Sequence, residues 1–255
     1  MKNILRSIAM AFSMFSKIPM PKVEWKSENM RYALAAMPLV GIVTGAIMLI
    51  WHLLCTKAGI GNILHAAGLT VLPIIITGGI HLDGYCDTVD ALSSHAEPEK
   101  KRQILKDPHT GAFAVIWCGI YILAYFAVMT EITTTYEILT AGLFTVASRA
   151  VTAFAAAAGR AAKKEGLYSE FNGSAKKTAV IITSAAFFAL AAAAAVFLSG
   201  YAAVSILAIP AVSAAVWAMA KKEFNGMSGD ILGFMLTASE IAAVFIYTVI
   251  KAVIG

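Results

Sequence analysis

Seven apolar stretches, each about 20 residues long, limit the possible fold of this chain more than any other feature. A helix of that length crosses the roughly 30 Å hydrocarbon core of a bilayer. Inside that core the backbone polar groups must be satisfied within the segment, which favours helices. The stretches lie near residues 32–54, 63–82, 111–130, 138–158, 178–199, 201–220 and 231–253. We therefore predict an all-α, polytopic membrane bundle of about seven transmembrane helices.

The composition agrees with a membrane protein and argues against a soluble one. Hydrophobic residues make up 59% of the 255 residues and charged residues 14%. Soluble domains hold about 45–50% apolar and about 25% charged residues. A soluble core of this length could not hide so much apolar surface, so lipid must cover it. We expect one membrane-embedded domain over residues 1–255, with the bundle at 32–253.

The basic residues predict the orientation of the bundle. Cytoplasmic loops of membrane proteins carry an excess of Lys and Arg. If the N-terminus lies inside, 17 of the 20 Lys and Arg residues fall in the inside segments 1–31, 93–109, 160–177 and 221–230. We therefore expect the N-terminus and these loops on the cytoplasmic side of the cell membrane. The net charge of +5 then reflects topology rather than binding of nucleic acid.

Residues 1–21 predict an interfacial helix that precedes the bundle. We expect it to end at Ile18, because proline disfavours a helical conformation in the residue before it, and Pro19 follows. A signal peptide is the alternative interpretation. Lys17 interrupts the apolar run, however, and no convincing cleavage site follows it.

Residues 78–90 contain the densest group of acidic residues near a predicted span. Asp83, Asp87 and Asp90 are spaced at i, i+4 and i+7, which places them within about 60° on one helix face. Three carboxylates this close do not ionise together unaided, and a divalent cation resolves the conflict. Oxygen ligands suit Mg²⁺, which takes one or two carboxylates together with substrate phosphates. A helix running continuously from residue 63 to 92 would be about 45 Å long, so the aspartates would lie at its cytoplasmic end.

That motif alone indicates a magnesium-dependent enzyme acting on a diphosphate, and several classes share it. A CDP-alcohol phosphotransferase would need an Ala-Arg pair where this chain has Asp87-Thr88. Membrane prenyltransferases usually present two aspartate-rich motifs, and here Asp230 is a lone second contributor. A cation-coupled transporter would place its site near the bilayer midplane, often within paired repeats. These alternatives stay open at the level of the motif.

Four segments, taken together and in order, are more specific. They are Phe15-Ser16-Lys17-Ile18-Pro19-Met20-Pro21, His81-Leu82-Asp83-Gly84-x-x-Asp87-Thr88-x-Asp90, Lys106-Asp107-Pro108-His109-Thr110-Gly111-Ala112-Phe113 and Gly226-Met227-Ser228-Gly229-Asp230-Ile231-Leu232-Gly233. This combination resembles the cobalamin synthase family (adenosylcobinamide-GDP ribazoletransferase). His109 stands where that family has an arginine.

The resemblance implies the last assembly reaction of the cobalamin nucleotide loop. The hydroxyl of alpha-ribazole, or of its 5′-phosphate, would attack the phosphorus nearer the cobinamide of adenosylcobinamide-GDP, and GMP would leave. The expected product is adenosylcobalamin or its 5′-phosphate. The expected partners are these small-molecule substrates and the lipid bilayer, while the sequence leaves open whether the chain forms a homo-oligomer.

The expected catalytic set is Asp83, Asp87, Asp90 and His81, with His81 as a candidate general base. The same aspartates and Asp230 are the expected Mg²⁺ ligands. A packing role is the alternative for His81, because it lies about 160° from the aspartate face of an ideal helix.

The expected substrate-binding residues are Lys106, Asp107, Arg149 and Gly229. Lys106 would neutralise diphosphate, or else serve only as one more inside charge. Arg149 lies within a span, where an ionisable residue is a functional hypothesis by default. It would bind substrate phosphate, or pair with Glu240 as a structural partner.

Overall fold

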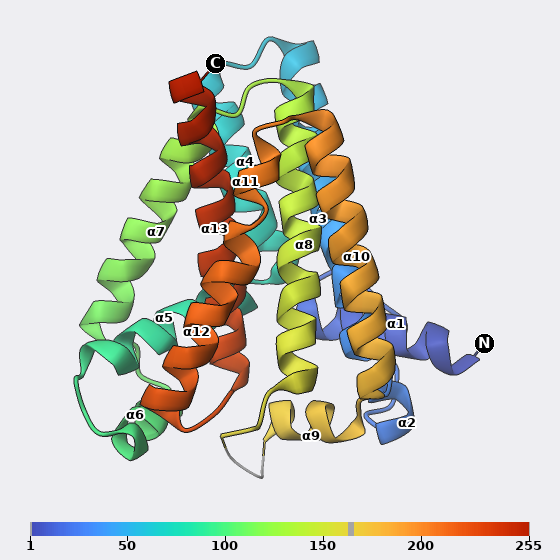
Figure 1. The fold of residues 1–255 in the computed structure, drawn as a ribbon, viewed down its shortest axis with the longest axis vertical. Coiled ribbons are helices and arrows are strands. Elements are labelled where there is room, and N and C mark those ends of the chain that lie inside the picture. The colour runs from blue at the N-terminus through green and yellow to red at the C-terminus, as the bar shows by residue number, and fades with distance from the viewer. Residues whose placement is uncertain (1, 163–165, 255) are drawn as a thin grey trace.

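The computed structural model describes residues 2–162 and 166–254, and over these ranges the chain is a bundle of helices without strands (Figure 1). One isolated bridge joins Ala161 and Met227. The helices are α1 (Lys2–Phe15), α2 (Ser27–Met30), α3 (Ala33–Ala58), α4 (Asn62–Thr77), α5 (Ile80–Ser93), α6 (Pro98–Ile104), α7 (Ala112–Thr130), α8 (Thr135–Ala158), α9 (Leu167–Ser174), α10 (Lys177–Leu198), α11 (Ala202–Ser205), α12 (Ala208–Phe224) and α13 (Gly229–Ile254).

The predicted spans agree with the long helices of the structure, with one exception. Within the described ranges, six helical segments are long and apolar enough to cross a membrane: α3, α7, α8, α10, α11 with α12, and α13. The chain turns at Ser199 and Gly200, between α10 and α11, as the sequence predicts. The prediction of an all-α polytopic bundle is confirmed, while the inside position of the N-terminus stays a prediction.

The exception is the predicted continuous helix over residues 63–92, which is wrong. The chain breaks at Gly78 and Gly79, whose φ angles are +64° and +77°, and α4 and α5 meet at 92°. Glycine adopts this left-handed conformation without the steric cost of a Cβ atom. The N–H groups of Gly78 and Gly79 donate to the carbonyls of Ile75 and Ile74, closing the end of α4. As a result, α5 runs across the bundle instead of extending from it (Figure 1).

Helix α8 lies at the centre of the bundle and is the most buried of the spanning helices. It packs against α3 through glycines on both helices. A Cβ atom on Gly41 would lie 2.7 Å from the carbonyl oxygen of Thr145, and one on Gly45 would lie 2.9 Å from Cα of Gly142. Small residues allow this close approach of helix backbones inside a membrane.

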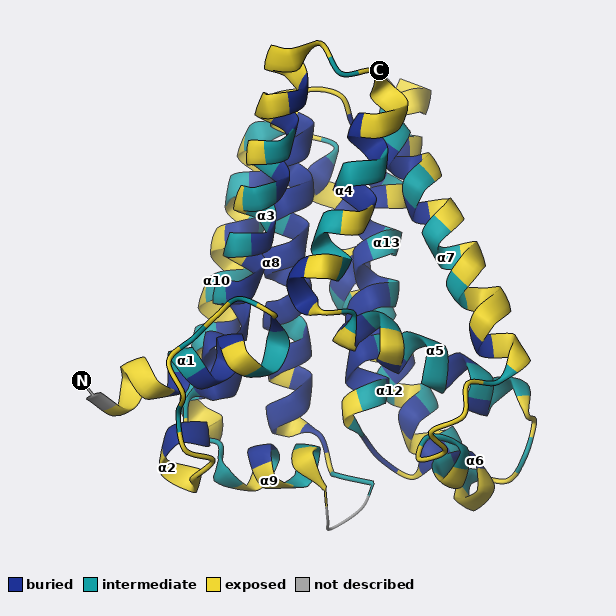
Figure 2. Cartoon of the chain, turned by 180° about the vertical axis from the view of Figure 1, so that it is seen from behind, coloured by how far each residue is buried: buried dark blue, intermediate teal, exposed yellow. Residues whose placement is uncertain are grey.

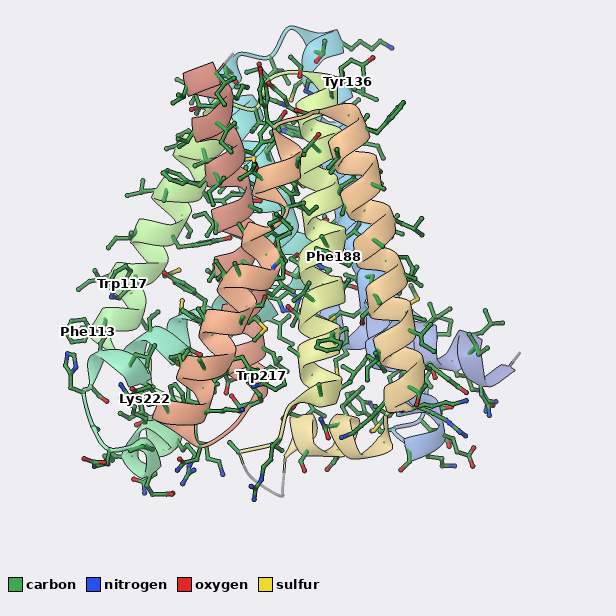
Figure 3. The ribbon with its side chains drawn as sticks, in the orientation of Figure 1. Phe113, Trp117, Tyr136, Phe188, Trp217 and Lys222 are labelled. Carbon is green, nitrogen blue, oxygen red and sulfur yellow. The ribbon has the colours of Figure 1, made fainter. Side chains whose placement is uncertain are left out.

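Helix α7 lies at the edge of the bundle and presents apolar side chains outward. Phe113 and Trp117 are 51% and 42% exposed and point away from the other helices (Figure 3). Yellow, exposed positions run along its length (Figure 2). Such an apolar outer face is what lipid would cover in a bilayer.

The N-terminal helix α1 ends at Phe15, three residues before the predicted end. Met10 and Ala11 on this helix are buried against the start of α3. After the helix, the backbone N–H of Lys17 donates to the carbonyl of Ile76 at 2.7 Å. The end of α1 is therefore fixed beside the break between α4 and α5. Its position at a membrane interface stays a prediction.

Candidate active site

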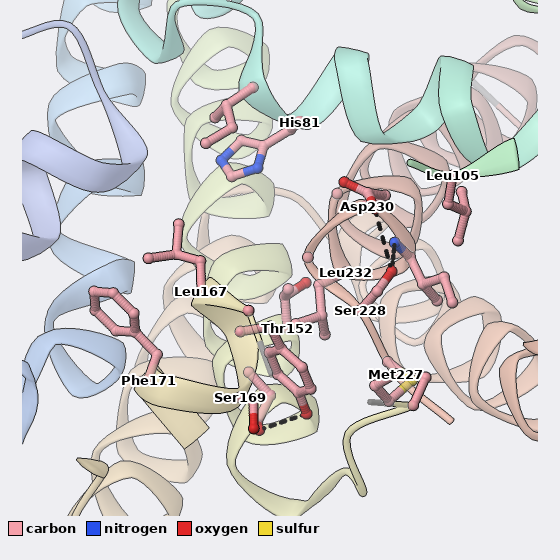
Figure 4. Close-up of a pocket in the computed structure, with 18 of the residues that line it drawn as sticks. His81, Leu105, Thr152, Leu167, Ser169, Phe171, Met227, Ser228, Asp230 and Leu232 are labelled. Carbon is pink, nitrogen blue, oxygen red and sulfur yellow. Dashed lines mark hydrogen bonds between the residues drawn. The ribbon is translucent and has the colours of Figure 1, made fainter. Parts of the chain in front are cut away.

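A cavity of about 350 Å³ opens among α1, α3, α5, α6, α8, α9, α12 and α13, beside the break between α4 and α5 (Figure 4). We call it the main cavity. Apolar and aromatic side chains form most of its wall, among them Phe15, Phe171 and Phe224. The polar residues in the wall come from segments that are far apart in the sequence. A mostly apolar pocket with a few convergent polar groups is typical of a ligand site.

The crossing of α5 and α13 forms one wall of this cavity, and two glycines make it possible. A Cβ atom on Gly84 would lie 2.7 Å from the carbonyl oxygen of Asp230. One on Gly233 would lie 3.0 Å from the carbonyl oxygen of His81. The hydroxyl of Thr237 donates to that same His81 carbonyl at 3.2 Å. The two helices are thus in backbone contact, which brings the segments of two sequence motifs together.

The contact places Asp83 of α5 and Asp230 of α13 in the wall of the same cavity. Asp87, one turn further along α5, lies close enough to Asp83, Asp90 and Asp230 for their charges to interact. The structure therefore brings Asp83 and Asp230 to one cavity wall and places Asp87 within reach of their charges. Like charges that interact in this way repel one another, and a cation near them would relieve that repulsion.

The side chain of Asp90 does not line the main cavity. Its carboxylate lies against the backbone of Gly111, before α7, so closely that a Cβ atom at Gly111 would collide with both carboxylate oxygens. Neither Asp87 nor Asp90 is part of the cavity wall, whereas Asp83 and Asp230 are. The sequence predicts three aspartates on one face of one helix. In the structure Asp83 faces the main cavity, whereas Asp90 faces the segment before α7.

The aspartates fit Mg²⁺ shared with a substrate better than a metal ion enclosed by protein. In the described part of the chain, no three His, Cys, Asp or Glu side chains are arranged to hold a metal ion by themselves. Mg²⁺ usually keeps water and binds through one or two carboxylates together with substrate phosphates. Asp83 and Asp230, facing one cavity from two helices, match that requirement. The complete set of four ligands stays a prediction.

Three polar groups in the wall of the main cavity have no hydrogen-bond partner in the described chain. They are Nε2 of His81, Oγ1 of Thr152 and Nε of Arg102, and all three atoms are buried. His81 is 8% exposed and Thr152 2%. Five other buried groups in the described chain, away from the cavity, also lack a partner, so this property is not confined to the cavity wall. A ligand would reach the three groups only if the side chains around them shifted.

His81 lies in the same cavity as Asp83, although the ideal-helix geometry separates them. The cavity lies at the first turn of α5, where the chain has just turned at Gly79, so residues from different sides of the helix reach it. The imidazole also stacks on Phe15, with ring centroids 6.4 Å apart and planes at 21°. The packing role predicted as an alternative is therefore present, and the ring also points into the cavity (Figure 4).

Two cationic side chains contribute to the cavity wall. Lys106 is one of them, in the position that the sequence predicts. Arg102 of α6 is the other; its Nη1 donates to the carbonyl of Phe224 at 3.2 Å, and its Nη2 pairs with the carboxylate of Glu99. Gly229, at the first residue of α13, also lines the cavity, and nothing lies within 4 Å of where its Cβ atom would be. Positive charge and open helix backbone are both suited to phosphate.

Asp107 lies outside this arrangement. It is exposed, and its carboxylate accepts hydrogen bonds from the backbone N–H of His109 at 3.0 Å and from Nδ1 of that residue at 2.7 Å. These bonds lower the pKa of Asp107 below its ordinary value. Asp107 shapes the turn before α7, and the structure does not bring it to the cavity with Lys106.

Arg149 pairs with Glu240, as one of the two interpretations of the sequence predicts. Its Nη1 lies 3.2 Å from Oε1 of Glu240 and donates to the carbonyl of Thr145 at 2.9 Å. The Arg149 side chain is 2% exposed, and neither partner lines the main cavity. The pair joins α8 to α13 in the interior of the bundle. Substrate binding by Arg149 stays a prediction.

Sequence reasoning missed two polar residues of the site, Arg102 and Thr152. Arg102 belongs to the basic run 100–102, which the positive-inside rule alone explains. The sequence therefore gives no reason to assign Arg102 to a binding site. Thr152 lies in an apolar helix without any motif. Only the fold shows that both side chains meet His81 in one cavity.

Comparison with known proteins gives matches over nearly the full length of the chain. The family described as cobalamin-5-phosphate synthase matches residues 7–248. An adenosylcobinamide-GDP ribazoletransferase of Lachnoclostridium phytofermentans is 38% identical over 256 residues, covering 98% of this chain and 96% of the relative. The protein of the same name from Clostridium botulinum is 34% identical, covering 96% and 98%. One from Geobacillus thermodenitrificans is 29% identical, covering 94% of both chains. No solved structure matches this chain.

Proposed function

This chain belongs to the cobalamin-5-phosphate synthase family, and we propose that it catalyses the reaction for which its relatives are named. The acceptor is alpha-ribazole or its 5′-phosphate, and the donor is adenosylcobinamide-GDP. A new P–O bond forms between the acceptor hydroxyl and the phosphorus nearer the cobinamide. The P–O bond to the GMP moiety breaks, GMP leaves, and a phosphodiester remains.

The main cavity supports this proposal through the polar groups that converge on it. Phosphoryl transfer depends chiefly on positioning and on neutralising charge. The cavity offers two carboxylates, Asp83 and Asp230, and two cations, Arg102 and Lys106. The convergence of these carboxylates and cations from α5, α13 and the segment around α6 on one cavity is the single observation that carries the assignment.

The roles of the side chains follow from their chemistry. Asp83 and Asp230, with Asp87 adjacent, would hold Mg²⁺, which when bound would neutralise charge on the diphosphate. Arg102 and Lys106 add positive charge toward the phosphates. Nε2 of His81 takes the proton of the attacking hydroxyl, since a neutral imidazole nitrogen without a partner is a suitable acceptor.

The location of the site is also part of the proposal. The helices identify a multi-pass membrane protein. The cavity lies beside α6 and α9, which belong to the segments 93–109 and 160–177, and these two segments carry nine of the 20 Lys and Arg residues. By the positive-inside rule these segments face the cytoplasm, so the site would open to the cytoplasmic side of the inner membrane.

The test measures GMP release by detergent-purified protein given adenosylcobinamide-GDP and alpha-ribazole 5′-phosphate, first with Mg²⁺ and then with EDTA. The expected result is GMP that depends on Mg²⁺, together with a new corrinoid product of the mass of adenosylcobalamin 5′-phosphate. Absence of turnover in a folded preparation would overturn the proposal. CDP-alcohol and prenyl diphosphate substrates would then be the next to test.

A further inference from the structure

Helix α6 places the two cations of the main cavity, Arg102 within the helix and Lys106 just after it. The helix has only seven residues, and an isolated helix shorter than about 12 residues is marginal in water. Contacts with the rest of the bundle must therefore set its position. One set of these contacts lies at the end of α12, beside which α6 lies (Figure 1).

Lys101 of α6 forms a buried ion pair with Glu223 of α12. Nζ of Lys101 lies 2.5 Å from Oε2 of Glu223, and the Lys101 side chain is 7% exposed. Lys101 is not part of the main cavity wall. Lysine is almost never fully buried in a protein unless it is paired. The Glu223 carboxylate is therefore what allows the Lys101 ammonium group to be buried at this place.

The ion pair is connected to the cavity through the next residue on each helix. Arg102 follows Lys101, and its Nη1 donates to the carbonyl of Phe224, which follows Glu223. Arg102 and Phe224 both line the main cavity. Leu105, after α6, packs against the same apolar cluster as Phe224. This apolar contact should keep α6 on the bundle when a charge is removed, so such a change should reorient the helix rather than detach it.

The two partners of the ion pair differ in their surroundings. The Glu223 side chain is 24% exposed, and its Oε1 lies 3.4 Å from Nζ of Lys222, whose side chain is 84% exposed. Glu223 therefore keeps water and a second lysine if Lys101 is removed. Among the residues that the structure describes, Glu223 is the only acid that pairs with Lys101. Loss of Glu223 leaves a buried charge without a partner, which is the costly direction.

We propose that Glu223 is a positioning residue, which through Lys101 sets the orientation of α6. The orientation of α6 in turn directs Arg102 and Lys106 toward the donor diphosphate. The inference rests on the proposed function. Without Glu223, the Lys101 ammonium group must move toward water, and α6 must turn with it. Arg102 then loses its bond to the carbonyl of Phe224, and both cations leave their places in the cavity wall.

The test measures GMP release by Glu223→Gln and by the wild-type protein, with unphosphorylated alpha-ribazole as the acceptor. We expect KM for adenosylcobinamide-GDP to rise about tenfold or more, since a hydrogen bond to a charged group contributes at least that much. KM for alpha-ribazole should change by less than about twofold, because this acceptor has no phosphate for the cations to bind. Glu223→Asp, which keeps the charge on a shorter side chain, should show a smaller rise and serves if Glu223→Gln does not fold.

Variants of Lys101 separate this role from a direct one. Lys101→Met removes the buried charge and should raise KM for the donor by less than about twofold. The double variant Lys101→Met/Glu223→Gln should resemble Lys101→Met, because no buried ammonium group remains to be paired. A double variant as impaired as Glu223→Gln would show that Glu223 does not act through Lys101, and the proposal would be wrong.

The matched control is Lys222→Met, which removes the exposed lysine from the same carboxylate. It should leave both KM values unchanged, since exposed ion pairs contribute little. Thermal unfolding of every variant is measured beside the kinetics. A lower unfolding temperature of Glu223→Gln with unchanged KM values would show that the ion pair supports only the fold, which would also overturn the proposal.

Equilibrium binding of inorganic pyrophosphate with Mg²⁺ makes the same comparison without turnover. Glu223→Gln should bind pyrophosphate more weakly than the wild-type protein, and the double variant should recover most of the loss. Equal binding by all three proteins would overturn the positioning role. If the expected binding pattern is found but the wild-type protein releases no GMP from adenosylcobinamide-GDP, the proposed function is wrong and the positioning role of Glu223 stands.

Discussion

Arg149 and Glu240 form a buried ion pair between the central helix α8 and the last helix α13, with Nη1 and Oε1 3.2 Å apart. Both side chains are less than a tenth exposed. Arg149 also donates to the carbonyl of Thr145, while its Nε has no partner in the described chain. A charge in the membrane interior must be paired or hydrogen-bonded. Each of these two residues therefore lowers the free-energy cost of burying the other.

Removing one partner of this pair is expected to destabilise the protein strongly. Arg149→Met and Glu240→Gln each leave the other group buried without its partner, which costs about 3–5 kcal/mol. The double variant Arg149→Met/Glu240→Gln removes both charges and should recover most of the loss. Thermal unfolding of the purified variants in detergent measures these differences. If Arg149→Met instead unfolds like the wild-type protein but raises KM for the donor, Arg149 binds substrate and the structural role is wrong.

Close packing of α5 on α13 leads to a second prediction. Gly84→Ala would place a Cβ atom 2.7 Å from the backbone oxygen of Asp230, which no side-chain rotation can relieve. The helices must then separate, so we expect a loss of about 1–3 kcal/mol in stability, as for overpacked cores. GMP release should fall at least tenfold, because Asp83 and Asp230 would move apart.

The matched control is Gly119→Ala on α7, where nothing lies within 4 Å of the added methyl group. Alanine is favoured over glycine inside a helix by roughly 0.5–1 kcal/mol, so this variant should be as stable as the wild-type protein or slightly more stable. Thermal unfolding and turnover are measured on both variants. Full activity in Gly84→Ala would mean that the α5–α13 contact does not position the site.

Hydropathy identified the spanning helices well because their lengths and compositions are set by the thickness of the bilayer. It could not identify the break between α4 and α5. The pair Gly78-Gly79 is compatible both with a continuous helix and with two left-handed residues, and local sequence does not decide between them. The decision is made by tertiary contacts, since the chain after α1 and the stem of Lys17 occupy the space beside the pair.

The site was predictable to the extent that its chemistry lies in contiguous motifs. Asp83 and Asp230 belong to two such motifs, and the structure brings them together. The roles of Arg102 and Thr152 depend on which helices pack against each other. The spacing of these residues along the chain does not predict that packing. The sequence left two roles open for His81, and the fold explains how it reaches the same cavity as Asp83. Its angle on an ideal helix matters little at a first turn that follows a sharp break.

Thr152 provides a test of the main cavity that does not disturb its charges. Its buried hydroxyl has no partner in the described chain, so Thr152→Val removes an unsatisfied group and should leave the unfolding temperature unchanged or slightly raised. If a substrate supplies the missing hydrogen bond, kcat/KM should fall about three- to tenfold. The control is Thr44→Val, whose hydroxyl already donates to the carbonyl of Val40 at 2.8 Å. Unchanged kinetics in Thr152→Val would remove this residue from the site.

The repulsion among the aspartates predicts a response to Mg²⁺ that can be measured without turnover. Asp87 lies near the charges of Asp83, Asp90 and Asp230, so Asp87→Asn relieves repulsion when no cation is present. In EDTA this variant should unfold about 2–4 °C above the wild-type protein, the shift that roughly 1 kcal/mol produces in a chain of this size. With Mg²⁺ and inorganic pyrophosphate the wild-type protein gains stability by binding these ligands, and the variant gains less. The difference in unfolding temperature between the two proteins should therefore become smaller or change sign.

The exposed Asp107 provides the control for this prediction, because its carboxylate is bonded to His109 and lies away from the cavity. Asp107→Asn should show the same response to Mg²⁺ as the wild-type protein. GMP release by Asp87→Asn should fall about a hundredfold, because charge neutralisation by one metal contact contributes several kcal/mol to phosphoryl transfer. If Mg²⁺ does not change the unfolding temperature of the wild-type protein, either with or without pyrophosphate, the assignment of these aspartates to a metal is wrong.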